Sequence, residues 1–169
     1  MAAAVEATYN CGLTIEETVA LGLDNSDDVP IVRDLGEHRG TLKATTPIKV
    51  SKSWDDTGVL SGGTALINLT ALSNGNLPNV NFTDLRVKLI KITCPAANTH
   101  AVVFVPNVAA DPYDIFGTAD DRVSVPAGGS IVMLFADKLE DCDGTHKNIA
   151  LTSGDADAAY SIAMVAGGT

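Results

Sequence analysis

Aromatic residues and positive charges are both scarce in this 169-residue chain. Aromatics make up 5% of it, and 11 Lys and Arg stand against 21 Asp and Glu, which leaves a net charge of −10. Single-stranded nucleic-acid binding uses aromatic side chains interleaved with cations, and the closest approach to this pattern is Trp54, which follows Lys49 and Lys52. The two shortages argue against nucleic acid or an anionic membrane surface as a partner. We interpret Trp54 as a core or interface residue.

Cysteines and long apolar runs are few as well. Cys11, Cys94 and Cys142 are odd in number and widely spaced, which fits buried or incidental thiols in a reducing compartment better than a disulfide framework. No segment approaches the roughly 18 unbroken apolar residues that a membrane span needs, and residues 1–11 lack the basic head and apolar run of a secretion signal. We therefore expect synthesis and folding in a cytoplasm, with no membrane partner.

Motifs for catalysis and cofactor binding are missing. The chain has no Gly-x-Ser-x-Gly nucleophile elbow, no Gly-x-Gly-x-x-Gly turn and no Gly-Lys-Ser/Thr phosphate loop. A jelly-roll hydrolase would need two converging carboxylates as acid and base, and the pairs Asp111/Asp114 and Asp120/Asp121 are so close in sequence that they more often point apart. We predict no catalytic residue and no cofactor.

Metal-ligand patterns are incomplete. Zinc prefers thiolate and imidazole ligands, but the spacings of Cys94 to His100 and of Cys142 to His146 match no close-set pair of a known zinc finger. Residues 141–144, Asp-Cys-Asp-Gly, resemble part of a calcium loop, although Thr152 stands where the bidentate Glu is needed. We predict no metal site and leave a weak calcium site open as the alternative.

The residues that are abundant indicate β-structure. From Val59 onward, short β-rich runs alternate with Gly, Pro, Asn and Asp, a pattern typical of an antiparallel sandwich or barrel. Gly62-Gly63 and Gly128-Gly129 are expected to form hairpin turns. We predict an all-β fold, an antiparallel β-sandwich or jelly-roll-like core over residues 59–169. Its strands are expected near 64–70, 85–93, 101–105, 121–125, 130–136, 147–151 and 159–165.

Two of these runs predict further detail. Apolar residues alternate with cations from Leu85 to Leu89 and then change phase to Ile90 and Ile92. A strand whose side chains have a period of two does this when a bulge lies near Leu89. Residues 131–135, Ile-Val-Met-Leu-Phe, are apolar on both faces, which indicates a central strand or a strand covered by another subunit.

The beginning of the chain is less regular. Thr14 and Glu17 fit a capping box that would open a short helix. An equally good interpretation is a strand through residues 13–21. Both interpretations stay open on the sequence.

The rest of this N-terminal segment combines a loop and extended stretches. Residues 24–28 are expected to form an exposed loop, and residues 41–54 one or two strands broken at Pro47. We predict an N-terminal arm with the first strands at 1–58, which lies across a neighbouring subunit, and a β-sandwich core at 59–169. Together they are expected to form one structural domain.

Charges are unevenly distributed along the chain. Four cations and no acid occur from Arg39 to Lys52, whereas acids concentrate in expected loops such as 111–121 and 137–143. Chance and the preference of Asp for turns explain this about as well as a second interpretation, in which basic strand faces of one subunit meet acidic loops of another. The second interpretation predicts salt-sensitive assembly. Its interface residues are Arg39, Lys43, Lys49, Lys52 and Trp54 on one side and Asp111, Asp120, Asp121, Asp141 and Asp143 on the other.

Three segments resemble the small β-sandwich structural proteins of tailed bacteriophages. They are residues 77–87, the Val125-Pro126-Ala127-Gly128-Gly129 turn before an apolar strand, and residues 161–167, and the resemblance covers roughly residues 59–169. It implies a virion protein made in the host cytoplasm, of the capsid decoration or cement type. Such proteins bind a major capsid protein and their own copies, often as trimers, and they have extended terminal arms and no active site.

The expected function is therefore that of a non-enzymatic virion structural protein that binds and stabilises the capsid lattice, ahead of a coat, head-fibre or tail role. The alternative is a carbohydrate-binding or adhesion β-sandwich module of a phage appendage or bacterial surface. Such a module uses exposed aromatic rings to stack on sugars. Trp54, Tyr9, Tyr113 and Tyr160 are too few and too scattered to favour it.

Overall fold

The computed structural model describes residues 6–19, 29–43, 49–74, 77–106, 110–117, 121–135 and 139–168. Every regular element in these residues is a β-strand, and neighbouring strands within each sheet run antiparallel. The expectation of an all-β chain with antiparallel sheets is therefore confirmed. None of the described segments supplies a helix long and apolar enough to cross a membrane.

The described strands form two large sheets and two ribbons. The four-stranded sheets have the orders β10-β7-β12-β3 and β4-β11-β8-β9, and the ribbons are β1-β2 and β5-β6. We call residues 49–168 the body and the β1-β2 ribbon the arm. The strands are β1 (Glu6–Val19), β2 (Val29–Lys43), β3 (Lys52–Val59), β4 (Thr64–Asn68), β5 (Leu72–Asn74), β6 (Leu77–Val80), β7 (Arg86–Thr93), β8 (Val102–Val105), β9 (Val123–Val125), β10 (Ser130–Leu134), β11 (Asn148–Thr152) and β12 (Ala159–Gly167).

One hydrophobic core joins the two four-stranded sheets. Buried side chains alternate along the strands as the pleat requires, for example Tyr160, Ile162 and Met164 in β12 and Val102 and Phe104 in β8. All five belong to a single cluster of buried residues, to which β3, β4, β7 and β11 also contribute. Because burying one large apolar side chain contributes about 1.5–3 kcal/mol, the stability of the body comes mainly from this cluster.

The seven strands expected beyond residue 59 are all present as β4 and β7 to β12, each beginning and ending within two residues of its expected range. The expected bulge is present too. Between β7 and β12, Leu89 faces Val165 and Val87 faces Ala166, so Lys88 is the extra residue of a bulge. Side chains therefore change phase at this point, as the apolar pattern predicted.

Two expectations about strands are corrected or narrowed. β1 runs through residues 14–17, so the helix interpretation is wrong and the strand interpretation is right. β10 lies at the edge of its sheet, so the central-strand interpretation of residues 131–135 is wrong. Coverage of this strand by another subunit stays a prediction. Residues 24–28 and Pro47 lie outside the described residues.

Gly62-Gly63 forms the expected two-residue turn, because the flanking residues Ser61 and Thr64 form an antiparallel bridge and both glycines have a positive φ, 62° and 78°. The strands that each glycine pair connects, β3 to β4 and β9 to β10, nevertheless belong to different sheets, so neither pair joins two neighbouring strands of one sheet. The second turn is tight, because the N–H of Gly129 donates to the carbonyl oxygen of Pro126 at 2.8 Å and Gly128 has a φ of 78°. Glycine fits this type II geometry without a steric penalty. The sequence identified the turns but not which strands they connect.

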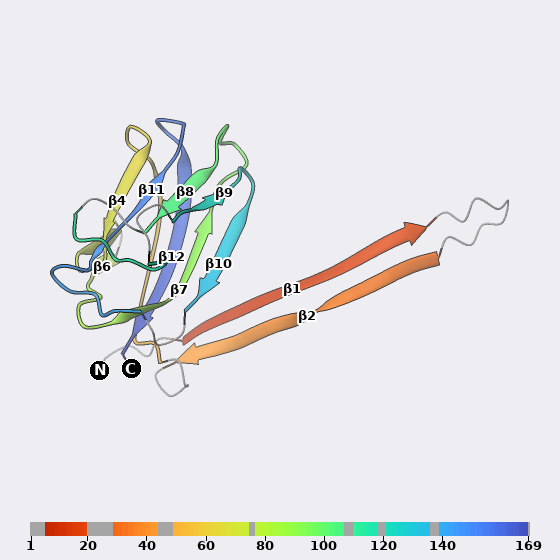
Figure 1. Ribbon diagram of the computed structural model, residues 1–169, viewed down its shortest axis with the longest axis horizontal. Helices are drawn as coiled ribbons and strands as arrows, with labels where there is room; N and C mark the ends of the chain where they lie inside the picture. Colours follow the sequence, from red (N-terminus) through yellow and green to blue (C-terminus); the bar gives the residue numbers. More distant parts are fainter. Residues whose placement is uncertain are drawn as a thin grey trace.

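The arm leaves the body as a long two-stranded ribbon (Figure 1). At the usual rise of about 3.3 Å per strand residue, its 14-residue first strand reaches about 45 Å. The base of the ribbon is held by a second, smaller apolar cluster made of Leu42, Val50, Leu89 and Val165, with Leu134 packed against it. Because Leu89 and Val165 are paired and lie outside the main core cluster, this contact occupies the outer face of the β10-β7-β12-β3 sheet.

Candidate functional site

The basic residues singled out from the sequence lie around the junction of the arm and the body. Arg39 and Lys43 belong to the part of β2 nearest the base of the arm, and nothing is described of their side chains. Lys49 is exposed on the segment that enters the body. Lys52, at the start of β3, donates a hydrogen bond from Nζ to the carbonyl oxygen of Asn81.

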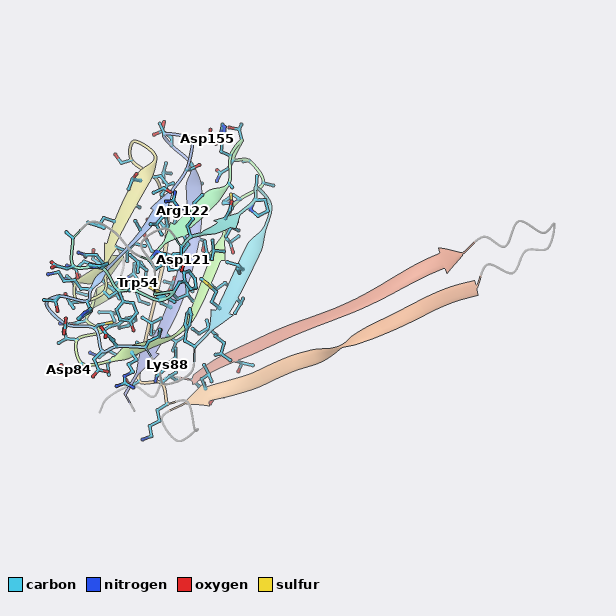
Figure 2. The ribbon with its side chains drawn as sticks, in the orientation of Figure 1. Trp54, Asp84, Lys88, Asp121, Arg122 and Asp155 are labelled. Atoms are coloured by element: carbon cyan, nitrogen blue, oxygen red, sulfur yellow. The ribbon has the colours of Figure 1, made fainter. Side chains whose placement is uncertain are left out.

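Trp54 lies inside the body (Figure 2). It is 6% exposed, and it is paired with Met164 on the adjacent strand β12. This burial leaves little of its surface for another chain.

The acidic residues lie on loops of the body, and two of these loops are in contact. The carbonyl oxygen of Asp111 accepts hydrogen bonds from the backbone N–H groups of Lys147, at 3.1 Å, and Asn148, at 3.0 Å. Segment 110–117 therefore lies against the end of segment 139–148. The contact brings Asp111 to the segment that carries Asp141 and Asp143.

Two of the predicted interface acids are already paired within the chain. Asp111 Oδ2 lies 2.9 Å from Lys147 Nζ, and Asp141 Oδ1 lies 2.8 Å from Arg86 Nε. Exposed pairs of this kind contribute only about 0–1 kcal/mol to stability, but they reduce the negative charge that each acid offers to a partner. Of the remaining predicted acids, Asp121 is partly exposed before β9 (Figure 2) and Asp120 lies outside the described residues.

The side chain of Asp143 stabilises a local turn. Its Oδ1 accepts hydrogen bonds from Thr145 N at 2.7 Å, Thr145 Oγ1 at 2.9 Å and His146 N at 2.8 Å. These donors, led by the backbone N–H of Thr145, hold the pKa of Asp143 well below its usual range. His146 is further fixed by Glu140, whose Oε2 lies 3.0 Å from His146 Nε2. The segment that resembled a calcium loop is thus organised by its own hydrogen bonds.

The buried side chain of Tyr113 connects segments 110–117 and 139–148 to β7 by hydrogen bonds. The hydroxyl of Tyr113 donates to the carbonyl oxygen of Glu140 at 2.9 Å and accepts from the N–H of Val87 at 3.1 Å. Burial raises the pKa of Tyr113, so the hydroxyl stays protonated. Cys142 is fully buried nearby, and burial raises the pKa of its thiol to about 12. A buried thiol that stays protonated is a poor nucleophile, because the thiolate is the reactive form.

The other cysteine and histidine pair does not converge either. Cys94 Sγ accepts from Asn98 Nδ2 at 3.2 Å, whereas His100 Nδ1 lies 2.6 Å from Asp155 Oδ1. In the part of the chain that the structure describes, no three His, Cys, Asp or Glu side chains come close enough to hold a metal ion.

One polar contact escaped the sequence analysis. The hydroxyl of Tyr160 in β12 donates to Asp56 Oδ2 in β3 at 2.8 Å, and burial together with Asp56 raises the pKa of Tyr160 to about 12. The two residues are 104 positions apart, so their spacing in the sequence offers no signal. Both line a small pocket that also includes Trp54.

Two surfaces lack a covering layer among the described residues. Neither β1 nor β2 pairs with any other described strand, so both outer edges of the arm keep unpaired backbone groups. β10 is an apolar edge strand, and its Val132 is 38% exposed. These two surfaces, rather than a pocket with reactive groups, are the best candidates for contact with other chains.

The chain matches no protein-family model, no curated protein and no solved structure.

Proposed function

We propose that this protein is a non-enzymatic structural protein of a tailed-phage virion, which decorates the capsid and cements its lattice. Its partners are then its own copies, in a homo-oligomer such as a trimer, and a major capsid protein. Its location is the virion, after synthesis in the host cytoplasm. The observation that carries this proposal is the arm.

The arm has the length and the unpaired strand edges of a segment that contacts another chain. A lone two-stranded ribbon is marginally stable at best in water, because it has no third strand or packed layer to bury its side chains. The arm extends about 45 Å, and the packing contact with the body that is described for it lies at its base, through Leu42. A ribbon of this kind becomes stable when a neighbouring subunit supplies the missing strand or face.

The apolar edge strand β10 supports assembly in a second way. Natural proteins usually protect sheet edges with charges, prolines or short strands, because an exposed apolar edge pairs with other chains. Positions 131–135 carry no charge and no proline. Ile131, Met133 and Phe135 pack against the main core and Leu134 against the cluster at the base of the arm, whereas Val132 is 38% exposed. Coverage by another subunit would bury Val132 and pair the free edge of the strand.

We further propose that the body is a β-sandwich with jelly-roll topology. Its eight main strands are β3, β4 and β7 to β12. If these strands are numbered 1 to 8 along the chain, one sheet has the order 1-8-3-6, which is β3, β12, β7 and β10. The other sheet has the order 2-7-4-5, which is β4, β11, β8 and β9. This order, with one core shared by both sheets, supports the jelly roll, a topology found in viral capsid proteins and lectins. Fold alone does not decide between these roles.

A shortened arm tests the proposal. Residues 10–39 are replaced by Asn-Gly, a two-residue turn that closes hairpins, so the pairs from Glu6–Lys43 to Tyr9–Gly40 and the anchor Leu42 are kept. We expect the body to unfold cooperatively as before. The mass by light scattering should fall to that of the monomer, and binding to empty capsids from the same source should be lost. Wild-type mass and capsid binding in this variant would contradict the proposal.

Variants of the edge strand test the contribution of β10 to assembly separately from that of the arm. Val132→Lys places a charge on the apolar edge and is expected to lower the oligomer mass. Val59→Lys makes the same change at a 58% exposed valine of β3 and serves as the matched control. Measuring the oligomer mass of both variants again in molar salt tests the contribution of charge. Assembly through basic and acidic surfaces weakens with salt, whereas backbone hydrogen bonding between strands of two subunits does not.

A further inference from the structure

The backbone groups of β10 divide between its neighbour β7 and its free edge. Just before β10, the carbonyl oxygen of Gly129 accepts a hydrogen bond from Cys94 N at 3.0 Å, and just after it, Phe135 N donates to the carbonyl oxygen of Lys88 at 2.8 Å. These two pairs extend the register of β10 and β7 at both ends. Because hydrogen-bonded pairs alternate with non-bonded ones in an antiparallel ladder, every second residue of β10 bonds to β7 and the others point outward.

The outward-pointing backbone groups belong to Ser130, Val132 and Leu134, on the side of β10 where no described strand pairs (Figure 1). The opposite edge of the same sheet, β3, carries Asp55 and Asp56. Charges of this kind protect natural sheet edges from pairing with other chains. β10 contains neither a charge nor a proline, so its edge lacks this protection and can accept a further strand.

Both faces of β10 fit a second copy of the same strand. When two β10 strands run antiparallel about a two-fold axis at Val132, this residue meets its own counterpart, and Ile131 meets Met133 of the second copy. Ile131 and Met133 pack against the main core but are only partly buried, and Val132 is 38% exposed on the other face. Pairing therefore continues the core across the contact and covers Val132. It places no like charges opposite each other, which would weaken a cross-strand pair.

We propose that β10 pairs with β10 of a second copy across a two-fold axis at Val132, so that two four-stranded sheets join into one. This inference rests on the proposed homo-oligomer and names a contact between its copies. Interfaces that are stable by themselves have about 20–30 residues on each side, and β10 offers five. The arm therefore has to hold the copies together as well, and a chain with the shortened arm stays monomeric.

The register makes a disulfide test specific. In the proposed contact, the two copies of Val132 form a hydrogen-bonded pair with Cα atoms about 5.5 Å apart, a separation that a disulfide bridges. Ser130 lies on the same face of the same strand but is opposite Leu134 of the second copy. The two copies of Ser130 are then about 13 Å apart along the strands, and a disulfide does not span Cα atoms more than about 7 Å apart.

The test uses full-length Val132→Cys and Ser130→Cys, oxidised with diamide after light scattering has checked that each keeps the wild-type mass. We expect Val132→Cys to form covalent dimers at least about tenfold faster than Ser130→Cys, because only its thiols come within bonding distance. Val59→Cys, at the exposed valine of β3, measures random collisions and is expected to behave like Ser130→Cys. Mass spectrometry of the linked peptides distinguishes a bridge between two copies of residue 132 from one that uses the native Cys11 of the arm.

The outcomes separate this inference from the proposed function. A bridge between two copies of residue 132, formed in an oligomer of wild-type mass and lost when the arm is shortened, supports the pairing. An oligomer of wild-type mass in which Val132→Cys bridges no faster than Ser130→Cys, or bridges to Cys11 instead, overturns the pairing and leaves the proposed function standing. A wild-type chain that stays monomeric overturns both.

Discussion

At the scale of single residues, the carboxylate of Asp155 joins two loops at the end of the body away from the arm (Figure 2). Its oxygens accept hydrogen bonds from Thr99 Oγ1 at 2.7 Å, Thr99 N at 3.0 Å and His100 N at 2.9 Å. These contacts, with the Thr99 hydroxyl first, lower the pKa of Asp155 to about 2. The loop between β11 and β12 is therefore tied to the loop between β7 and β8 by one ionised side chain.

This link predicts a pH dependence of stability. The pKa of an aspartate in an unfolded chain is about 3.9, so the folded state holds the proton of Asp155 less tightly than the unfolded state. The stabilisation is fully present above about pH 4 and is lost as the pH falls through about 2. In urea unfolding from pH 5 down to pH 2, the free-energy difference between wild type and Asp155→Asn is expected to shrink. A difference that stays constant over this range would contradict the assignment.

Asp157→Asn is the control for that measurement. It removes one charge from an exposed position in the same loop. It leaves the contacts of Asp155 with Thr99 and His100 in place. Any effect common to both variants is then an effect of net charge rather than of the link.

At the scale of elements, the end of β12 is crossed closely by the segment that leads from the arm into the body. A Cβ on Gly167 would lie 2.0 Å from the carbonyl oxygen of Lys49, and Ser51 N donates to the carbonyl oxygen of Ala166 at 2.9 Å. The crossing holds the base of the arm against the sheet. Glycine is required here for close approach of two backbones, not for an unusual backbone conformation.

We therefore expect Gly167→Ala to destabilise the body by about 1–3 kcal/mol, as overpacking of a tight contact does. The measurement is the free energy of unfolding in urea, followed by circular dichroism. Gly144→Ala is the matched control, because nothing lies within 4 Å of its added Cβ, and surface changes of this kind usually stay within about 0.5 kcal/mol. Equal stability of the two variants would show that the crossing is not tight.

Patterns in the sequence predicted some of the secondary-structure elements and missed others. Alternation and turn residues placed the seven strands beyond residue 59, and a change of phase placed the bulge beside Leu89, because both are local consequences of the pleat. The same patterns missed β3, β5 and β6 as separate strands. They also suggested a central position for residues 131–135, because apolar composition does not reveal whether a strand is covered by its own chain or by another.

The candidate site was predicted only in part. Loops rich in Asp were recognisable, but the sequence did not show that Asp111 pairs with Lys147 and Asp141 with Arg86. Partners of this kind lie on other elements, and only the packing of loop against loop brings them within reach. The contribution of each predicted interface residue to assembly stays a prediction.

At the scale of the whole molecule, the body and the arm are built on different principles. The body buries apolar side chains from two sheets in one core, whereas the arm is a single ribbon anchored at its base by the cluster around Leu42. Local stability follows buried apolar contact and the number of neighbouring strands. The two parts are therefore expected to differ widely in how often their hydrogen bonds open.

Hydrogen exchange tests this expectation. In the dissociated chain, amides of the arm, residues 6–19 and 29–43, should exchange close to the rate of an unfolded peptide, while those of β7 and β12 exchange only through global unfolding. On binding to capsids, the arm amides should become protected while those of β7 and β12 change little. An arm that is as protected as β12 in the monomer would show that it needs no partner.

The sequence by itself determined the all-β character of the chain, the position of most strands in the body and the absence of the common catalytic motifs. These properties depend on neighbouring residues, through side-chain alternation and turn preference. Only the tertiary structure decided which strands share a sheet, that β10 lies at an edge, and that Trp54, Asp56 and Tyr160 line one pocket. Those properties join residues far apart in the chain, and only the burial of a common core brings them together.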